Sequence, residues 1–213
     1  MSQMVQLPRE TRAAEVRASS FDEAAHTIEI VWTTGATVRR YSWECGPYDE
    51  ILEVSATSVR LERLNAGAPF LNTHSSRDLS QVIGSVVPGS AKIEGGRGTA
   101  TILLSRAAAD ADIVQKIRDG VIRNVSAGYI RHQIEKTETD DGKVPVWRVT
   151  DWEPCEISAV PIPADPGAQT RSADTLFPCV VTQAERAAPA AASLAETVAT
   201  RLRMNARRLG LKA

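Results

Sequence analysis

NVSAGY, residues 124–129, is a strand-length run of small and apolar residues that follows a helix-length segment closed by Gly120. Taken alone, a serine in such a run indicates an ordinary strand residue. Two other stretches change this interpretation of Ser126, because residues 72–74 (NTH) lie upstream and residues 151–158 (DWEPCEIS) lie downstream. Together the three stretches supply a hydroxyl, an imidazole and carboxylates, which are the side chains of an acyl-transfer site.

Short runs of alternating apolar and polar residues, separated by turn residues, predict several β-strands. The predicted strands are a hairpin of residues 27–32 and 38–41, an antiparallel pair at 82–87 and 99–104, a hairpin of 125–130 and 144–152, and a final strand at 156–162. One amphipathic helix is predicted from near Ala107 to Gly120, with Ser105 as its cap. These elements predict a mainly β protein with helices, of the α+β class, folded as an antiparallel barrel or a strongly bent sheet with helices outside.

Composition divides the chain into three parts. Residues 1–20 are predicted to be an N-terminal edge segment, residues 21–171 one globular domain, and residues 172–213 a tail. In the tail, an Ala/Pro-rich linker at 187–192 precedes apolar residues spaced four apart, which predicts a basic amphipathic helix near the end. From residue 187 onward five basic residues and one acid give a net charge of 5 − 1 = +4.

Charge and composition exclude several classes of partner as the first expectation. The chain has 25 Lys+Arg and 26 Asp+Glu, so a net charge of −1 provides no long-range attraction to nucleic acid or to an acidic membrane. Three cysteines at scattered spacings predict neither a zinc site nor a disulfide framework. No run approaches the roughly 20 apolar residues that cross a bilayer, and no signal-like core follows Met1. A cytoplasmic protein is therefore expected.

His74 is the best placed of the three histidines to act as a base. It directly follows a short apolar strand, whereas His26 lies in a predicted turn and His132 lies among charged residues. A lone histidine is more often a surface or structural group than a base, so His74 gains weight only from the rest of the chain. The three stretches must converge in space for this interpretation to hold.

The candidates for an acid that orients the base are Asp151, Glu153 and Glu156. Alternation places Glu156 and Ser158 on one face of a strand whose other face is apolar, where an unpaired carboxylate would be costly. An imidazole would supply the missing partner of Glu156. The alternative is a structural salt bridge to an arginine such as Arg131 or Arg148.

Four blocks, in this order and spacing, make the chain resemble the prohead serine proteases of tailed bacteriophages, which are capsid maturation endopeptidases. The blocks are residues 68–74 (APFLNTH), 82–86 (VIGSV), 124–129 (NVSAGY) and 156–168 (EISAVPIPADPGA). The resemblance runs from about Phe21 to Arg171. It implies that His74 is the general base and Ser126 the nucleophile.

The acid that opens the last block, Glu156, is the third member that the resemblance implies, with Asp151 as the reserve candidate. These proteases are similar to the herpesvirus assemblins, in which a second histidine takes the third place; here His132 lies too close after Ser126 to correspond. The similarity implies an antiparallel β-barrel ringed by helices, and a homodimer. No metal or other cofactor is implied.

The function that the resemblance implies is cleavage of the scaffold protein and of the delta regions of the major capsid protein, including the protease's own end. The implied place is the host bacterial cytoplasm, inside the assembling prohead. The alternative is a non-catalytic capsid-assembly protein that docks through its basic tail. An unrelated hydrolase is a third possibility, although residues 124–128 lack the G-x-S-x-G elbow.

Overall fold

The computed structural model describes residues 2–7, 9–16, 20–43, 46–137, 144–161 and 177–183, with the backbone alone for residues 11–16. The strands are β1 (Ser2–Leu7), β2 (Glu10–Val16), β3 (Thr27–Thr33), β4 (Val38–Ser42), β5 (Gly46–Leu52), β6 (Pro69–Asn72), β7 (Val82–Val86), β8 (Lys92–Glu94), β9 (Arg97–Leu104), β10 (Asn124–Thr137), β11 (Val146–Ala159) and β12 (Phe177–Gln183). The α-helices are α1 (Glu62–Asn65) and α2 (Ala111–Arg118), and the short 3-10 helices are η2 (Leu79–Gln81) and η3 (Ala108–Asp110).

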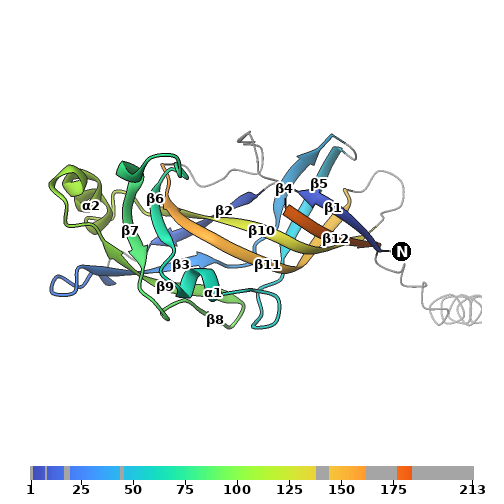
Figure 1. The fold of residues 1–213 in the computed structure, drawn as a ribbon, viewed down its shortest axis with the longest axis horizontal. Coiled ribbons are helices and arrows are strands. Elements are labelled where there is room, and N and C mark those ends of the chain that lie inside the picture. Colours follow the sequence, from blue (N-terminus) through green and yellow to red (C-terminus); the bar gives the residue numbers. More distant parts are fainter. Residues whose placement is uncertain are drawn as a thin grey trace, which may run out of the picture.

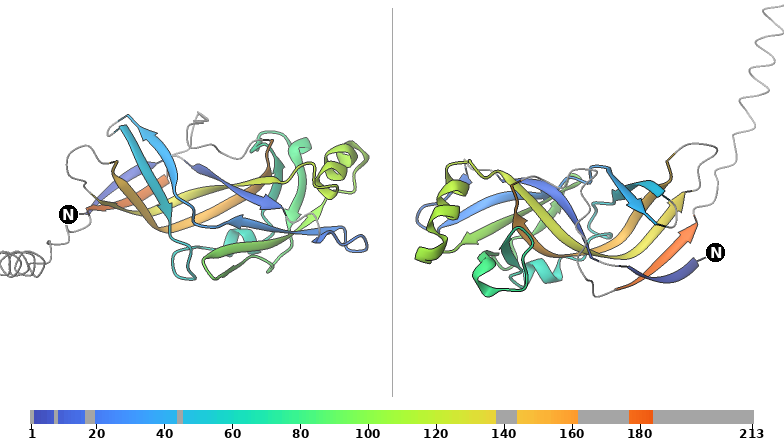
Figure 2. Two further views of the ribbon diagram at one scale, coloured as in Figure 1. Left: turned by 180° about the vertical axis from the view of Figure 1, so that it is seen from behind. Right: turned by 90° about the horizontal axis from the view of Figure 1, so that it is seen from above.

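The antiparallel hairpin of β10 and β11 forms the centre of the fold, and both strands run along the length of the molecule (Figure 1). On the edge away from β11, β10 pairs with β2 near its start and with β12 near its end. On the edge away from β10, β11 pairs in parallel with β5 near its start and with β6 near its end. The hairpin therefore has two halves, one flanked by β2 and β6 and the other by β12 and β5, and Figure 2 shows both halves from two further directions.

Successive side chains of the two long strands point to opposite faces of the hairpin, and both faces are buried. In β10, Val125, Ala127 and Tyr129 point into the main apolar core, where Ile157 of β11 joins them. Ser126, on the opposite face of β10, is buried as well. β10 therefore has apolar residues on one face and a buried polar residue, Ser126, on the other.

Several predicted elements are found at their predicted places. The hairpin predicted from 125–130 and 144–152 exists as β10 and β11, but both strands are longer than predicted, and residues 125–130 pair with 153–159. The 82–87 and 99–104 pair is confirmed as β7 and β9. The helix that ends at Gly120 is confirmed, since α2 stops at Arg118 and Gly120 has a positive φ of 70°. Its start was predicted too early: Ser105 accepts a hydrogen bond from the Ala107 N–H, but η3 intervenes before α2 begins.

One pairing and one strand boundary were predicted wrongly. The strands at 27–32 and 38–41 exist, yet β3 pairs with β2 and β9 while β4 pairs with β5, so the two do not form a hairpin. The strand predicted at 156–162 is the second half of β11, which continues without a break from Val146 to Ala159. In the first case the local pattern located both strands, whereas the partner of each depends on residues far away in the sequence.

The prediction of a mainly β protein with few helices is confirmed. In the half that contains Ser126, the pairings run from β10 through β2, β3, β9, β7, β6 and β11 and return to β10. The barrel of assemblin type, ringed by helices, stays a prediction, because β2 and β3 share only two residue pairs and both α-helices in the described ranges are short. Within those ranges, no helix is long and apolar enough to span a membrane.

The division into three domains stays a prediction. β12 lies in the segment predicted as the tail, yet it belongs to the sheet through its pairings with β1 and β10. The Ala/Pro-rich linker and the basic amphipathic helix fall in residues 184–213, which lie outside the described residues.

A buried network of charges connects β10 to β2, β4 and β5. The carboxylate of Glu50 accepts from Arg40 Nε at 3.0 Å and Arg131 Nη1 at 3.1 Å, and the Tyr129 hydroxyl donates to it. Glu10 pairs with the same two arginines, at 2.9 Å from Arg40 and 3.1 Å from Arg131. Burial alone would lower the pKa of Arg131, but the Glu10 and Glu50 carboxylates outweigh it and raise that pKa above its ordinary value.

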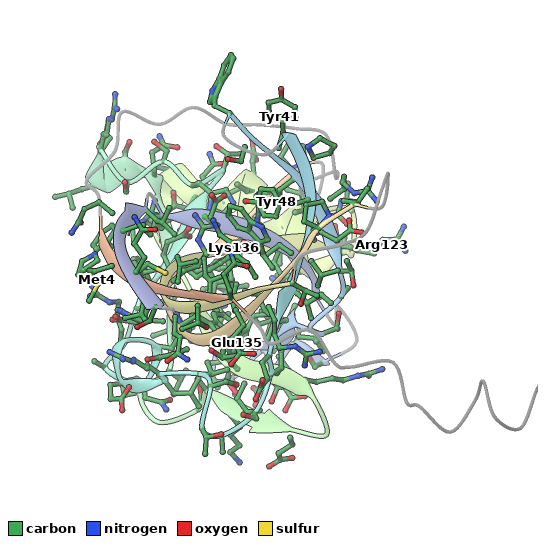
Figure 3. All side chains as sticks on the ribbon, turned by 90° about the vertical axis from the view of Figure 1, so that its right-hand side faces the viewer. Met4, Tyr41, Tyr48, Arg123, Glu135 and Lys136 are labelled. Atoms are coloured by element: carbon green, nitrogen blue, oxygen red, sulfur yellow. The ribbon has the colours of Figure 1, made fainter. Side chains whose placement is uncertain are left out.

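Aromatic side chains pack at the same end of the molecule, which faces the viewer in Figure 3. The rings of Tyr48 and Trp147 stack with their centroids 3.9 Å apart. The Lys136 ammonium lies 3.8 Å from the centre of the Trp147 ring, within the range of a cation–π interaction. These contacts join β5 to the hairpin.

We expect Arg131→Met to lower the free energy of unfolding by about 3–5 kcal/mol, because it leaves the buried Glu50 carboxylate without one of its cationic partners. The control is Arg39→Met, which removes a largely exposed pair with Asp49 and is expected to cost less than about 1 kcal/mol. Urea unfolding of both variants measures the difference. Equal small losses would show that the network contributes little.

Candidate functional site

His74 is the second residue after β6, where the chain leaves the sheet. The Thr73 N–H donates to the Ala159 carbonyl at 2.9 Å and thereby makes the last backbone bond between the two segments. Thr73 and His74 both have positive φ angles, 52° and 61°, a conformation that costs on the order of 1 kcal/mol for residues other than glycine. This turn brings His74 Nδ1 to 2.7 Å from Glu156 Oε1.

The register of β10 and β11 puts the other candidate residues on one face. Ser126 lies directly opposite Ser158, and Gly128 lies directly opposite Glu156. Residues that face each other across an antiparallel ladder point to the same side of the sheet. The hydroxyl of Ser126 and the carboxylate of Glu156 therefore lie on the side of the hairpin to which His74 turns.

The Ser126 hydroxyl is buried and unbonded. Its residue is 1% exposed, and within the described part of the chain its Oγ makes no hydrogen bond, to His74 or to any other group. A buried hydroxyl without a partner is uncommon, because the loss of water is not compensated. In this conformation the imidazole and the carboxylate are hydrogen-bonded to each other, whereas the Ser126 hydroxyl is bonded to neither.

The imidazole has a defined orientation. A carboxylate only accepts hydrogen bonds, so the 2.7 Å contact assigns a proton to Nδ1 for the bond with Glu156, and in the neutral form of the ring the lone pair is then on Nε2. Glu156 is 2% exposed and the His74 side chain 21% exposed, so the pair is screened from water while the ring remains accessible. An imidazole held in this way can accept a proton from a hydroxyl.

The structure places the rival acids elsewhere. Both carboxylate oxygens of Asp151 bind Arg60, at 2.7 and 2.5 Å, in a largely exposed pair. Glu153 binds Arg63 at 2.6 Å and His132 at 3.2 Å. Neither carboxylate contacts His74, so Glu156 is the acid that the fold brings to this imidazole.

The remaining alternatives are also accounted for. Of the two arginines predicted as alternative partners of Glu156, Arg131 and Arg148, the former binds Glu50 and Glu10 on the other face of the hairpin. His26 Nε2 contacts the Ser105 carbonyl at 3.2 Å, which is a structural contact. Burial raises the pKa of the Cys155 thiol to about 11, so this neighbour of Glu156 is protonated at neutral pH and is a poor nucleophile.

A β-bulge lies directly beside Glu156. The partner of Gly128 is Glu156 and the partner of Tyr129 is Pro154, so Cys155 is an extra residue without a partner in β10. Bulges redirect side chains and are common next to active sites. Here the bulge permits Pro154 in a central strand. It also shifts the alternation of side chains, so that Glu156 does not follow the pattern of the residues before it.

Two residues of this cluster were not recognised from the sequence. Ser158 donates to Glu156 Oε2 at 2.6 Å and accepts from the His74 N–H at 3.1 Å. A Cβ at Gly128 would lie 2.1 Å from Glu156 Oε1, so the glycine makes room for the carboxylate. Alternation did place Ser158 on the face of Glu156, which was the one available sign.

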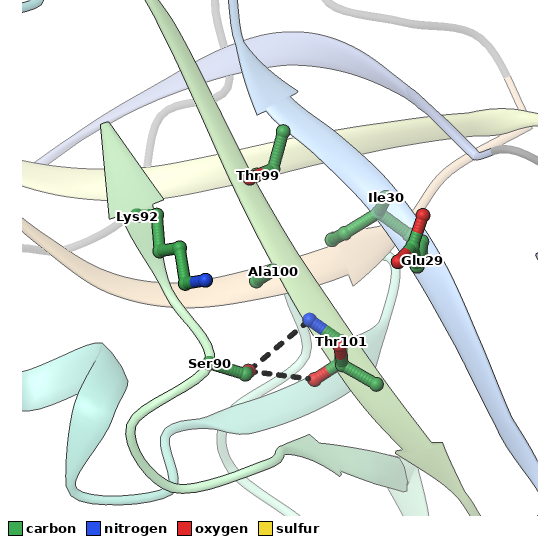
Figure 4. Close-up of a pocket in the computed structure, with 7 residues that line it drawn as sticks. All are labelled: Glu29, Ile30, Ser90, Lys92, Thr99, Ala100 and Thr101. Atoms are coloured by element: carbon green, nitrogen blue, oxygen red, sulfur yellow. Dashed lines mark hydrogen bonds between the residues drawn. The ribbon is translucent and has the colours of Figure 1, made fainter. Parts of the chain in front are cut away.

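A pocket in the described part of the chain lies away from the candidate side chains. A pocket of about 210 Å³ lies between β3, β8 and β9, and it contains none of the candidate side chains (Figure 4). Its lining residues are Glu29, Ile30, Ser90, Lys92, Thr99, Ala100 and Thr101. Among the residues with described side chains, no group of three or more His, Cys, Asp or Glu is suited to hold a metal ion.

Comparison with known proteins identifies the family. Residues 37–177 match the model of a family described as caudovirus prohead serine protease. A protein named major capsid protein, from Halomonas phage phiHAP-1, is 32% identical over 117 residues, which are 55% of this chain and 19% of that protein. The match thus spans about a fifth of that curated relative, and no solved structure matches the chain. Because the family model covers more than half of the sequence, the chain belongs to the caudovirus prohead serine protease family.

Proposed function

We propose that this chain is a serine endopeptidase of phage capsid maturation, in which Ser126 is the nucleophile, His74 the general base and Glu156 the acid that orients the base. One observation carries the proposal: His74 Nδ1 lies 2.7 Å from Glu156 Oε1, and Ser158, which binds both residues, faces Ser126 across the ladder. A hydroxyl, an imidazole and a carboxylate from distant parts of the sequence thus come together. Packing alone gives no reason for such a combination.

In the proposed reaction, His74 Nε2 takes the proton of the Ser126 hydroxyl while Oγ bonds to the carbonyl carbon of the substrate. The carbonyl electrons move to the oxygen, and their return breaks the C–N bond as His74 gives its proton to the leaving amine. Water then attacks the acyl ester: His74 takes a proton from the water and returns it to Ser126 Oγ. The Glu156 carboxylate stabilises the imidazolium in both halves of the reaction.

The buried state of Ser126 fits this proposal if the substrate completes the site. Catalytic hydrogen bonds are often long in a free enzyme and tighten only in the complex. Rotation of the Ser126 hydroxyl toward His74 Nε2, together with displacement of the groups that cover it, would make the missing bond. The orphaned oxygen then becomes the reacting atom.

The proposed substrates are the major capsid protein with its delta region, the scaffold protein and the protease's own end. The name of the Halomonas phage relative, major capsid protein, supports the capsid protein as the first of these. We place the reaction in the host bacterial cytoplasm, inside the assembling prohead, with a homodimer as the quaternary state. The cycle of paired strands around Ser126 supports a barrel of assemblin type as the scaffold of the site.

A non-catalytic assembly protein is the second candidate. The closed environment of Ser126 and the name of the relative favour it, because a capsid-bound domain without activity has no need of an accessible nucleophile. The two candidates differ in a single observable, the appearance of new chain ends.

Mixing the purified protein with the major capsid protein of its own phage tests the proposal. We expect the capsid protein to shorten at one position, which intact-mass spectrometry detects as one new N-terminus. Heat-unfolded protein at the same concentration is the control. Association with capsid shells that leaves the mass of the capsid protein unchanged would support the assembly protein and reject the protease.

A further inference from the structure

We infer that Ser158 is a positioning residue that locks His74 and Glu156 into one unit, and that Gly128 provides the space in which this unit forms. The inference rests on the proposed function, since it assigns a partner to the proposed base and acid. Ser158 Oγ donates to Glu156 Oε2 at 2.6 Å and accepts from the His74 N–H at 3.1 Å. With the bond from His74 Nδ1 to Glu156 Oε1, these contacts close a ring of three hydrogen bonds.

The ring needs a side chain that both donates and accepts a hydrogen bond, as a hydroxyl does. One contact requires a donor, because a carboxylate accepts, and the other requires an acceptor, because a backbone N–H donates. Ser158 is 0% exposed, so no water replaces either bond if the hydroxyl is removed. The side chain of Ser158 therefore has a function that alanine cannot supply.

The position of the Ser158 oxygen is fixed from both sides. Its strand pairs with β10 at Ser126 on one edge and with β6 at Leu71 on the other. A residue held in two ladders has little freedom of its backbone, so its hydroxyl is a rigid reference point for both partners. This rigidity is what orientation of a catalytic base demands.

The bond to the His74 N–H matters because the backbone there is strained. Thr73 and His74 are both in the left-handed region, and Thr73 makes the last ladder bond to β11. The Ser158 hydroxyl takes the next N–H and so continues the attachment by one residue beyond the sheet. Without it, we expect the turn to relax and the imidazole to leave the carboxylate.

Gly128 contributes through the atom it lacks. It faces Glu156 across the ladder, and a Cβ there would meet Oε1 at 2.1 Å, far inside contact distance. Since Oε1 is the oxygen that binds His74, any side chain at position 128 displaces the atom on which the orientation of the imidazole depends. Gly128 and Ser158 thus constrain the two oxygens of the same carboxylate.

The test compares Ser158→Ala with Ser158→Cys and with the control Ser90→Ala. Ser90 matches Ser158 because its hydroxyl also makes two bonds, donating to the Thr101 carbonyl at 3.3 Å and accepting from the Thr101 N–H at 3.1 Å, but in the pocket of Figure 4. Cysteine keeps the volume of the side chain and offers only weak hydrogen bonds, so it remains informative if the alanine variant does not fold.

We expect kcat for a peptide substrate to fall about 10²-fold in both Ser158 variants with KM unchanged, the size of effect that small misplacement of a catalytic group produces. The rate at which a fluorophosphonate labels Ser126 is expected to fall by a similar factor. Ser90→Ala is expected to keep both rates within about twofold. All rates are expressed per folded molecule, which urea unfolding determines, so a purely structural effect would not change them.

The outcomes separate the inference from the proposed function. Wild-type protein that neither cleaves nor reacts with the fluorophosphonate would overturn the proposed function and, with it, the inference. Active wild-type protein with unchanged rates in Ser158→Cys would overturn the inference alone. Loss of kcat together with loss of the proton NMR signal of the His74 Nδ1–H, in a variant that remains folded, supports it.

Discussion

Replacing Ser126 by alanine is expected to reduce peptide cleavage on the order of 10⁵- to 10⁶-fold, because no other group takes the place of the nucleophile. The fold is expected to remain intact. The Ser126 oxygen is buried and has no hydrogen-bond partner among the described residues, so its removal breaks no bond to them and relieves a desolvation cost of about 1–3 kcal/mol. The variant should therefore be inactive and at least as stable as the wild type.

Steady-state cleavage and urea unfolding of the same preparation measure these two effects. Ser90→Ala is a suitable control, because it removes a bonded serine hydroxyl far from the candidate site and is expected to keep its activity. Undiminished cleavage by Ser126→Ala would remove Ser126 from the mechanism. A large loss of stability would show that the hydroxyl has a structural partner.

Glu156→Gln is expected to reduce cleavage on the order of 10³- to 10⁴-fold, as loss of the acid does in Ser-His-acid enzymes. An amide that donates to His74 Nδ1 would force the proton onto Nε2, where the base must accept. An amide turned the other way would lose the negative charge that stabilises the imidazolium and would compete with the Ser158 donor. Either orientation impairs the reaction while the size of the side chain is preserved.

Asp151→Asn is the matched control for this variant, since it changes the reserve candidate by the same single atom. Its carboxylate forms a largely exposed pair with Arg60, which contributes at most about 1 kcal/mol. We expect its cleavage rate to stay within about threefold of the wild type. A greater loss in Asp151→Asn than in Glu156→Gln would reverse the assignment of the acid.

The sequence predicts individual strands better than their partners. Alternating residues located β3 and β4, but not that β3 pairs with β2 and β9, because pairing depends on which distant strand offers a complementary edge. β12 was missed, since residues 172–213 were assigned as a whole to the tail. The β10–β11 hairpin was predictable because its two strands are close in sequence and share an alternating pattern.

The same reason limits prediction of the site. The family was recognised correctly from four blocks of residues, and the fold brings His74 to Glu156 on the face that contains Ser126. The functions of these three residues stay predictions. What the sequence could not reveal are the contacts of Ser158 and the space left by Gly128, because both depend on the register of two strands and on the bulge at Cys155.

The measurement that tests the central claim most directly is the mapping of a fluorophosphonate adduct by peptide mass spectrometry. Such reagents bond to a serine that an adjacent base activates. We predict one adduct, on Ser126, which is absent from His74→Ala protein that is still folded. An adduct on another residue, or none in protein that cleaves the capsid protein, would contradict the assignment of Ser126 as the nucleophile.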